Sequence, residues 1–139
     1  MKQGFVKVAS ATPRIRVADP VYNAQVICEQ AKEAAEHGAK IVVFPELCIT
    51  GYTCNDLFLQ ELLLEKAKEA LLTIVEETGQ LEALFLVGLP VEKDGRLYNV
   101  AAVLYRGRIL GMIPKKNIPM YAEFYEGRHF TPGEETVTE

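Results

Sequence analysis

The segment IVVFPELCITGY at residues 41–52 places an acidic residue directly after a short apolar run. Four consecutive apolar residues, 41–44, are typical of a strand buried on both faces of a sheet. Pro45 has no amide hydrogen to continue a strand ladder, so the predicted strand ends there. Glu46 is therefore expected at the carboxyl end of a buried strand, where open α/β folds place their reactive groups.

The residues before this segment predict a strand and a helix. Residues 4–12 indicate a strand. A helix is expected to begin after Asp19, with Pro20 at its first position, and to end at Gly38. A strand, a helix and a second strand with short connections are typical of a right-handed parallel crossover.

The residues after the segment predict a second helix and then antiparallel hairpins. The expected elements are a helix over residues 57–78, a strand over 83–89 that Pro90 ends, and hairpin strands over 97–105 and 109–113. An Asp-Gly pair at residues 94–95 and a tight turn at residues 106–108 would connect these strands. The sequence therefore predicts an α/β fold with a mixed sheet and helices on one face.

Composition indicates one cytoplasmic domain. The chain has 139 residues and a formal net charge of −4, and its 15 Lys and Arg residues are scattered. Scattered basic residues in an acidic chain argue against a nucleic-acid or membrane surface. No apolar run is as long as a membrane span, and the start lacks a signal-peptide pattern. A small-molecule or protein partner is expected.

The cysteines and histidines predict neither a disulfide framework nor a metal site. Three cysteines, Cys28, Cys48 and Cys54, lack C-x-x-C spacing, and the two histidines are far apart. Cys48 and Cys54 lie close to Glu46 in sequence, so a nucleophilic role has to be weighed. Neither is followed by the strand, turn and helix that expose a nucleophile, so inert buried thiols are favoured.

Two lysines follow the last predicted strand, at the start of a long loop over residues 114–139. Lys115 and Lys116 alone would indicate a solvated surface pair. Together with Glu46 they match a known pattern: FPEL at residues 44–47 with GY at 51–52, and K-x-x-I-P at 115–119. This combination resembles the nitrilase, or carbon-nitrogen hydrolase, superfamily, which uses a glutamate, a lysine and a cysteine. Residues 51–57 and 119–130 more narrowly resemble the N-terminal glutaminase domains of glutamine-dependent NAD+ synthetases.

The resemblance assigns roles that suit the chemistry of each side chain. Glu46 would be the general base, and Lys115 would stabilise the oxyanion, with Lys116 as the alternative if the register differs by one. By resemblance, Glu126 would orient the lysine. Tyr52 and Tyr121 would line the glutamine pocket.

The resemblance also implies a larger protein. It implies a nitrilase-like α-β-β-α sandwich, of which residues 1–139 would be roughly the first half. In the family the nucleophilic cysteine follows a further strand beyond the lysine, and none of the three cysteines matches its motif. We therefore expect the chain alone to be inactive, and expect it to need no cofactor or metal of its own.

The parent protein would hydrolyse L-glutamine and use ATP and Mg2+ to amidate deamido-NAD+. Apolar sheet surface left without cover around residues 84–87 would make a homo-oligomer. Two alternatives remain: a stand-alone nitrilase-family amidase, and a binding module without enzyme activity. The sequence downstream of residue 139 would discriminate between the three.

Overall fold

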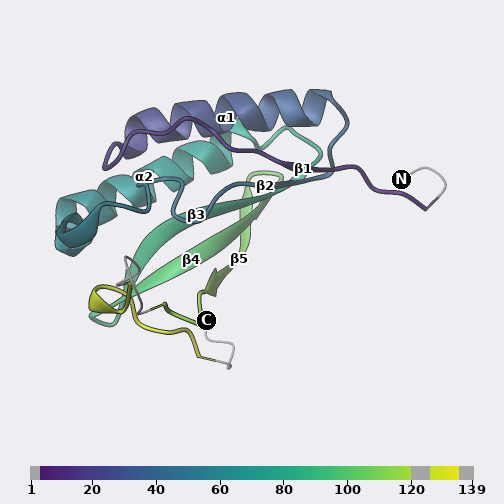
Figure 1. Cartoon of the computed structure of the whole chain (residues 1–139). Coiled ribbons are helices and arrows are strands. Elements are labelled where there is room, and N and C mark those ends of the chain that lie inside the picture. Colours follow the sequence, from purple (N-terminus) through teal and green to yellow (C-terminus); the bar gives the residue numbers. More distant parts are fainter. Residues whose placement is uncertain (1–3, 120–125, 135–139) are drawn as a thin grey trace.

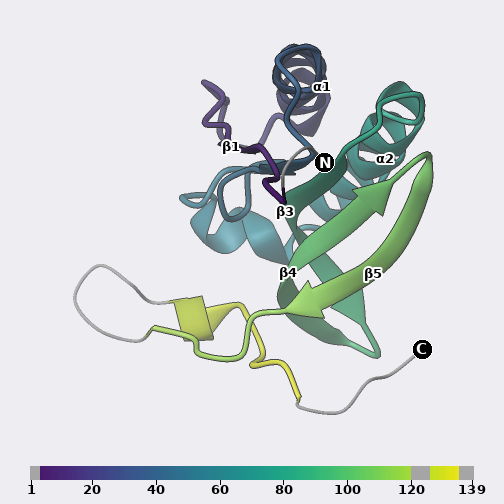
Figure 2. The ribbon, with the colours of Figure 1, turned by 90° about the vertical axis from the view of Figure 1, so that its right-hand side faces the viewer.

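The computed structural model describes residues 4–119 and 126–134. Within these residues, two α-helices lie on one side of a five-stranded sheet, as Figures 1 and 2 show. The elements are β1 (Val8–Ser10), α1 (Pro20–Glu36), β2 (Ile41–Val43), the 3₁₀ helix η1 (Asn55–Leu59), α2 (Glu61–Glu77), β3 (Leu84–Lys93), β4 (Arg96–Tyr105), β5 (Arg108–Pro114) and the 3₁₀ helix η2 (Glu126–Arg128). No helix of this described part is long and apolar enough to cross a lipid bilayer.

The sheet has the strand order β1-β2-β3-β4-β5. β1, β2 and β3 run parallel, whereas β3, β4 and β5 are antiparallel neighbours. Both hairpin turns have two residues with positive φ, Asp94 and Gly95 in the first and Arg106 and Gly107 in the second, as tight hairpins of matching twist require. The predicted mixed sheet, with crossovers first and hairpins after, is confirmed.

The core lies between the helices and one face of the sheet. Side chains alternate along a strand, so Val42 and Phe85, 0% and 1% exposed, face the helices. Ile27 of α1 and Leu71 of α2 are as fully buried, at 0% and 1%. Asp19 caps α1 by accepting from the Tyr22 amide at 3.2 Å, as its position before Pro20 predicts.

The prediction that the strand before Glu46 is buried on both faces is wrong. Ile41 and Val43 are 37% and 43% exposed, because both helices cover only the opposite face. For the same reason only alternate residues of 84–87 are left without cover. Leu84 and Leu86 are half-buried on the face away from the helices, whereas Phe85 and Val87 are buried.

Three predicted boundaries also differ from the structure. The first strand covers only residues 8–10 instead of 4–12, and the helix expected over 57–78 is divided into η1 and α2. The strand that Pro90 was expected to end continues to Lys93. β2 pairs with β3 only as far as Leu86, so Pro90 lies where one side of β3 has no neighbouring strand and a missing amide hydrogen costs no ladder bond.

Candidate active site

Glu46 lies in a tight turn that follows β2. Phe44 continues the strand pairing through its amide, which donates to Leu86 O at 3.0 Å, and the chain turns immediately after Pro45. Leu47 has a φ of +53° and is fully buried, so packing holds a non-glycine residue in the left-handed region. Its carbonyl accepts from the Gly51 amide at 2.7 Å, which closes the turn.

Gly88 of β3 is the surface on which this turn rests. A Cβ atom at Gly88 would lie 2.4 Å from Leu47 N and 2.9 Å from Pro45 O, so no larger residue fits without moving the backbone. The Ile49 amide donates to Gly88 O at 3.1 Å. The turn that carries Glu46 is thus fixed to a strand of the sheet, which suits a side chain whose position matters.

Lys115 follows the end of β5, two strands away from β3. Its amide donates to Asn99 O at 2.7 Å, and its carbonyl accepts from Gly133 N at 2.8 Å. The backbone of Lys115 is therefore held from both sides. This arrangement directs the lysine at the carboxyl end of the parallel strands, where Glu46 lies.

Glu126 opens the short helix η2 (Glu126–Arg128), which is anchored by aromatic and polar contacts. Phe130 is 4% exposed and packs edge-on against Phe58, with ring centroids 4.9 Å apart. The His129 ring lies 3.0 Å from the Asp56 carboxylate, measured from Nε2 to Oδ1. η2 is therefore tied to η1, the segment that follows the Glu46 turn in the chain.

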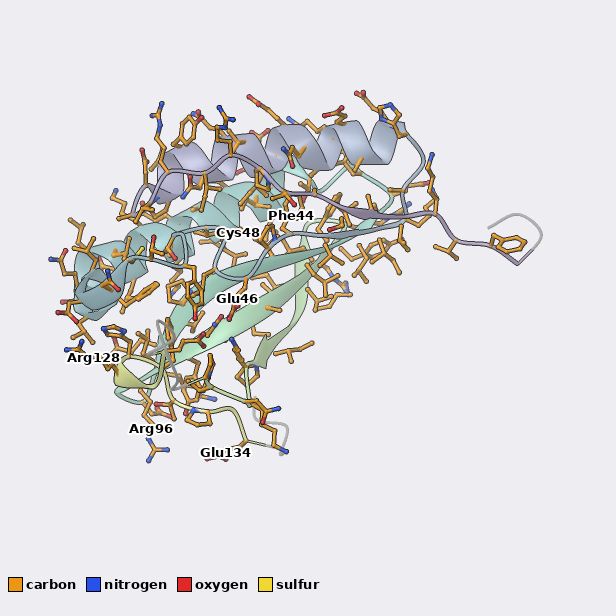
Figure 3. All side chains as sticks on the ribbon, viewed as in Figure 1. Phe44, Glu46, Cys48, Arg96, Arg128 and Glu134 are labelled. Carbon is orange, nitrogen blue, oxygen red and sulfur yellow. The ribbon has the colours of Figure 1, made fainter. Side chains whose placement is uncertain are left out.

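Glu46, Lys115 and Glu126 meet in one cluster. Glu46 Oε1 accepts from Lys115 Nζ at 2.5 Å and from Asn99 Nδ2 at 2.6 Å. Glu126 Oε1 accepts from Lys115 Nζ and from the Tyr52 hydroxyl, each at 3.0 Å, and Glu126 Oε2 accepts from Asn99 Nδ2 at 3.1 Å. Figure 3 shows Glu46 between the layer that holds Phe44 and Cys48 and the C-terminal segment that carries Arg128.

The charges of the cluster reinforce each other. Burial by itself would lower the pKa of the Lys115 ammonium, but the hydrogen bonds and charges of Glu46 and Glu126 outweigh it and raise that pKa above its usual value. Burial, followed by the hydrogen bond to Glu126, raises the pKa of Tyr52 to about 12. At neutral pH Lys115 is a permanent cation and Tyr52 a hydrogen-bond donor.

The structure brings together four of the residues weighed from the sequence. Glu46, Lys115, Glu126 and Tyr52 share the cluster. Tyr121 lies outside the described residues. Lys116, the alternative to Lys115, is exposed and takes no part in these contacts to Glu46 and Glu126.

Asn99 is a member of the cluster that the sequence analysis missed. Asn99 lies in β4 (Arg96–Tyr105) and is 3% exposed. An amide in an otherwise apolar strand, between Tyr98 and Val100, is a usable signal, because a buried polar side chain needs hydrogen-bond partners. The predicted strand was correct, but its polar residue was not questioned.

None of the three cysteines has the surroundings of a reactive thiolate. Burial raises the pKa of Cys48 and of Cys28 to about 11, and it also raises that of Cys54. Cys48 Sγ lies 3.7 Å from Gly88 O, and Cys54 Sγ lies 3.2 Å from Thr50 O, so both contact backbone carbonyls instead of Glu46. Their thiols belong to the apolar core.

In the part of the chain that the structure describes, no three His, Cys, Asp or Glu side chains gather in a way that could hold a metal ion.

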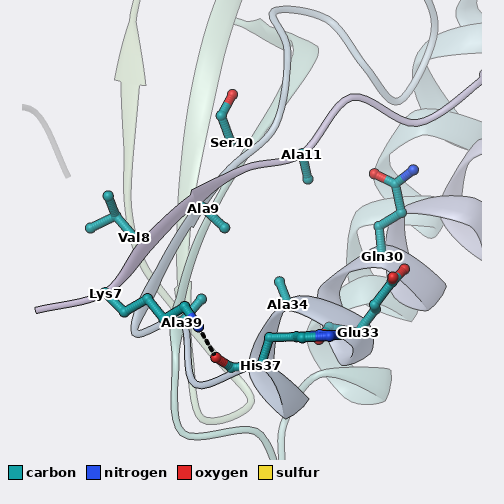
Figure 4. A pocket seen from close by; sticks show the side chains of 10 residues that line it. All are labelled: Lys7, Val8, Ala9, Ser10, Ala11, Gln30, Glu33, Ala34, His37 and Ala39. Atoms are coloured by element: carbon teal, nitrogen blue, oxygen red, sulfur yellow. Dashed lines mark hydrogen bonds between the residues drawn. The ribbon is translucent and has the colours of Figure 1, made fainter.

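An open hollow of about 220 Å³ lies between β1 and α1, as Figure 4 shows. Lys7, Ser10 and Glu33 are among its lining residues, and the Lys7 ammonium donates to His37 O at 2.6 Å. None of the residues of the glutamate-lysine cluster lines it.

Comparison with known proteins identifies the family of this chain. Residues 7–139 match the family model of the carbon-nitrogen hydrolases. The chain belongs to the carbon-nitrogen hydrolase family. A glutamine-dependent NAD+ synthetase of Mycobacterium tuberculosis is 41% identical over 133 residues, which are 96% of this chain and 20% of that protein. The chain thus spans about a fifth of the length of this curated relative.

Solved structures share the fold of this carbon-nitrogen hydrolase chain. A glutamine-dependent NAD+ synthetase from Cytophaga hutchinsonii has a TM-score of 0.90 at 29% identity, over 96% of this chain and 23% of that one. An amidase from Nesterenkonia sp. has a TM-score of 0.78 at 24% identity, over 97% of this chain and 51% of that one, which shows the fold alone. The expected family and the nitrilase-like α/β fold are confirmed.

Proposed function

We propose that residues 1–139 are part of the glutaminase domain of a glutamine-dependent NAD+ synthetase. The domain would hydrolyse L-glutamine, and the ammonia would pass to an ATP- and Mg2+-dependent synthetase part that amidates deamido-NAD+. The supporting observation is the cluster of Glu46, Lys115 and Glu126, assembled from three distant segments in a chain 41% identical to such a synthetase. The cluster holds the base and the cation that amide hydrolysis requires.

In the first step a thiol attacks the side-chain amide of glutamine. The thiol would come from a cysteine beyond residue 139, because the three cysteines here are buried among apolar residues. Glu46 accepts the thiol proton, and the sulfur bonds to the amide carbon, whose oxygen becomes an oxyanion. Lys115 stabilises it: an ammonium has three N–H donors, and in the described residues two of them face Glu46 and Glu126.

In the second half of the reaction the proton returns. Glu46 gives it to the departing nitrogen, which leaves as ammonia, and a thioester remains. A water molecule then gives a proton to Glu46 and attacks the thioester carbon. The carbon–sulfur bond breaks, glutamate is released, and Glu46 returns the proton to the sulfur, which restores the thiol. Tyr52, half-buried beside the cluster, and Tyr121 would line the pocket that holds the glutamine.

The test uses the full-length protein, meaning the protein that the complete gene encodes. Glu46→Gln keeps the shape of the side chain and removes the base. Formation of NAD+ from deamido-NAD+ and ATP should then fall by at least about 100-fold with glutamine as nitrogen source, and should continue with added ammonium. Glu65→Gln is the matched control, because Glu65 is an exposed glutamate of α2.

Each other result has a defined meaning. Equal loss with glutamine and with ammonium would assign Glu46 a structural role. Amide hydrolysis without any NAD+ formation would identify a stand-alone amidase. Absence of amide hydrolysis by the unmodified protein would favour a binding module.

A further inference from the structure

Asn99 contacts the cluster through both its backbone and its side chain. Its backbone carbonyl accepts from the Lys115 amide at 2.7 Å, while its side-chain nitrogen lies 2.6 Å from Glu46 Oε1 and 3.1 Å from Glu126 Oε2. One residue of β4 therefore contacts all three charged members of the cluster. Asn99 is 3% exposed, so water cannot easily replace these contacts.

The orientation of the Asn99 amide follows from its neighbours. Both oxygens that it faces belong to carboxylates, which only accept hydrogen bonds when ionised. The NH₂ group must therefore point toward them, since the amide oxygen would be repelled by both. Its two hydrogens match two acceptors, one on Glu46 and one on Glu126.

The two oxygens of the Glu46 carboxylate have different hydrogen-bond partners in this arrangement. Oε1 accepts from both Lys115 and Asn99, whereas Oε2 accepts from no side chain or backbone group among residues 4–119 and 126–134. The Glu46 side chain is 41% exposed. One oxygen is anchored and the other is open.

We propose that Asn99 is a positioning residue that anchors Glu46 through Oε1 and leaves Oε2 as the oxygen that accepts the proton. This inference rests on the proposed function, in which Glu46 is the general base. Asn99 would act through its contact with Glu46 and not on the substrate directly. Its two donors also separate two carboxylates that would otherwise repel each other beside a single ammonium.

Two substitutions in the full-length protein test this role. Asn99→Ser shortens the side chain and removes the two-donor bridge without adding charge. Asn99→Asp keeps the shape, replaces the donor by an acceptor and brings a third negative charge to the cluster. Both changes favour the protonated form of Glu46, so the acid limb of the kcat/KM profile for glutamine should move to higher pH, by on the order of one pH unit for Asp and less for Ser.

Asn23 supplies the matched control. It is a fully buried asparagine of α1 whose Nδ2 donates to the backbone carbonyls of Arg16 and Ile49, at 2.7 and 2.8 Å. Asn23→Ser should lower the melting temperature and leave the acid limb unmoved, because within residues 4–119 and 126–134 no ionisable side chain accepts from Asn23. Ammonium-dependent synthesis reports in every variant whether the protein remains folded.

The outcomes separate this inference from the proposed function. Full glutaminase activity in Glu46→Gln would overturn the proposed function. If Glu46→Gln is inactive with glutamine but Asn99→Ser and Asn99→Asp both keep the acid limb of the unmodified protein, Asn99 is only a structural residue and this inference is wrong. A shift of the acid limb to higher pH in both variants, larger in Asn99→Asp than in Asn99→Ser, would support this inference.

Discussion

Glu46 and Glu126 contact the same ammonium group, yet the protein holds them in opposite ways. The Glu126 side chain is 3% exposed, and both of its oxygens accept hydrogen bonds, from Tyr52, Lys115 and Asn99. The Glu46 side chain is 41% exposed and uses one oxygen. The buried carboxylate accepts three hydrogen bonds on both oxygens, and the exposed one accepts two on a single oxygen.

This difference indicates a division of labour. A buried carboxylate that accepts three hydrogen bonds, shared between both of its oxygens, is held in one position, so Glu126 is suited to fix the position of Lys115. A half-exposed carboxylate with one oxygen that accepts no hydrogen bond from the described residues can exchange protons with a ligand, and Glu46 is suited to that task. Two identical side chains thus differ by their surroundings alone.

The supports of the two glutamates differ as well. Glu46 is carried by a turn that lies directly on β3, with no space for a side chain at Gly88. Glu126 is carried by η2, which is held by side chains, through the pairs Phe58 with Phe130 and Asp56 with His129. We expect the backbone at Glu46 to be the less tolerant of substitution.

The largest expected effect comes from Lys115, which contacts both carboxylates. Lys115→Ala removes the cation that we propose stabilises the oxyanion, and it leaves the carboxylates of Glu46 and Glu126 without their shared partner. Glutamine hydrolysis by the full-length protein should fall by on the order of 100-fold or more in kcat. Lys116→Ala, on the adjacent exposed residue, should stay near the unmodified rate; the reverse pattern would move the role to Lys116.

Gly88→Ala tests the support of the Glu46 turn. The added methyl would overlap Leu47 N and Pro45 O, so the turn must shift, and we expect a loss of about 1–3 kcal/mol in unfolding free energy together with lower glutaminase activity. Urea unfolding measures the first and steady-state kinetics the second. Gly111→Ala is the control, because a Cβ at this strand glycine meets no atom within 4 Å. Equal effects at both positions would contradict the close packing at Gly88.

The sequence was sufficient for the order of the elements, and it named four residues that the structure brings into contact. Periodicity and the Asp-Gly turn predicted the mixed sheet. Glu46 and Lys115 each follow the end of a predicted strand, but their roles were assigned by resemblance to the nitrilase superfamily. The prediction that β2 is buried on both faces was wrong, because four apolar residues in a row do not reveal how many faces of a sheet are covered. The prediction that the strand ends at Pro90 was also wrong. The sequence does not show that β2 pairs with β3 only as far as Leu86 and so leaves Pro90 without a partner strand on that side.

Asn99 shows where reasoning from sequence reaches its limit. Its chemistry depends on two carboxylates 53 and 27 residues away in the chain. Only the pairing of β4 with β3 and β5 brings these segments together, and that pairing is a property of the whole sheet. Glu126 was assigned by resemblance, and its burial, too, follows from contacts across the sequence.

Glu126→Gln compares the two glutamates directly. The amide keeps the shape and can still accept from Tyr52 or Lys115, but the charge beside Lys115 is lost. Glu46 still contacts the ammonium, so we expect a loss of about 10-fold in kcat for glutamine, the equivalent of one weakened hydrogen bond to a charged group and less than for Glu46→Gln. Glu134→Gln, at an exposed residue of the same C-terminal segment, is the control. Losses of equal size in Glu126→Gln and Glu46→Gln would remove the proposed division of labour.

The smallest effect at neutral pH is expected for Tyr52→Phe, which removes the hydroxyl that donates to Glu126 Oε1. Near pH 7 the free energy of unfolding should fall by about 1 kcal/mol, the contribution of one ordinary hydrogen bond. The alkaline range is more informative, because burial and Glu126 raise the pKa of Tyr52 from 10.0 to about 12. Between these values the folded protein keeps a proton that the unfolded chain loses, so the stability that Tyr52 contributes is complete below pH 10 and falls as the pH rises through 12.

Urea unfolding at several pH values checks this sign. From pH 10 to 12 the unmodified protein should lose stability faster than Tyr52→Phe, because Lys115 titrates in both proteins and only the phenol differs. Tyr105→Phe, at a half-exposed tyrosine at the end of β4, should follow the unmodified protein. Parallel curves for the unmodified protein and Tyr52→Phe would mean that Tyr52 ionises as readily in the folded state as in the unfolded one. The hydrogen bond from the phenol to Glu126 would then contribute nothing to stability, and the contrast between the two carboxylates would depend on Lys115 and Asn99 alone.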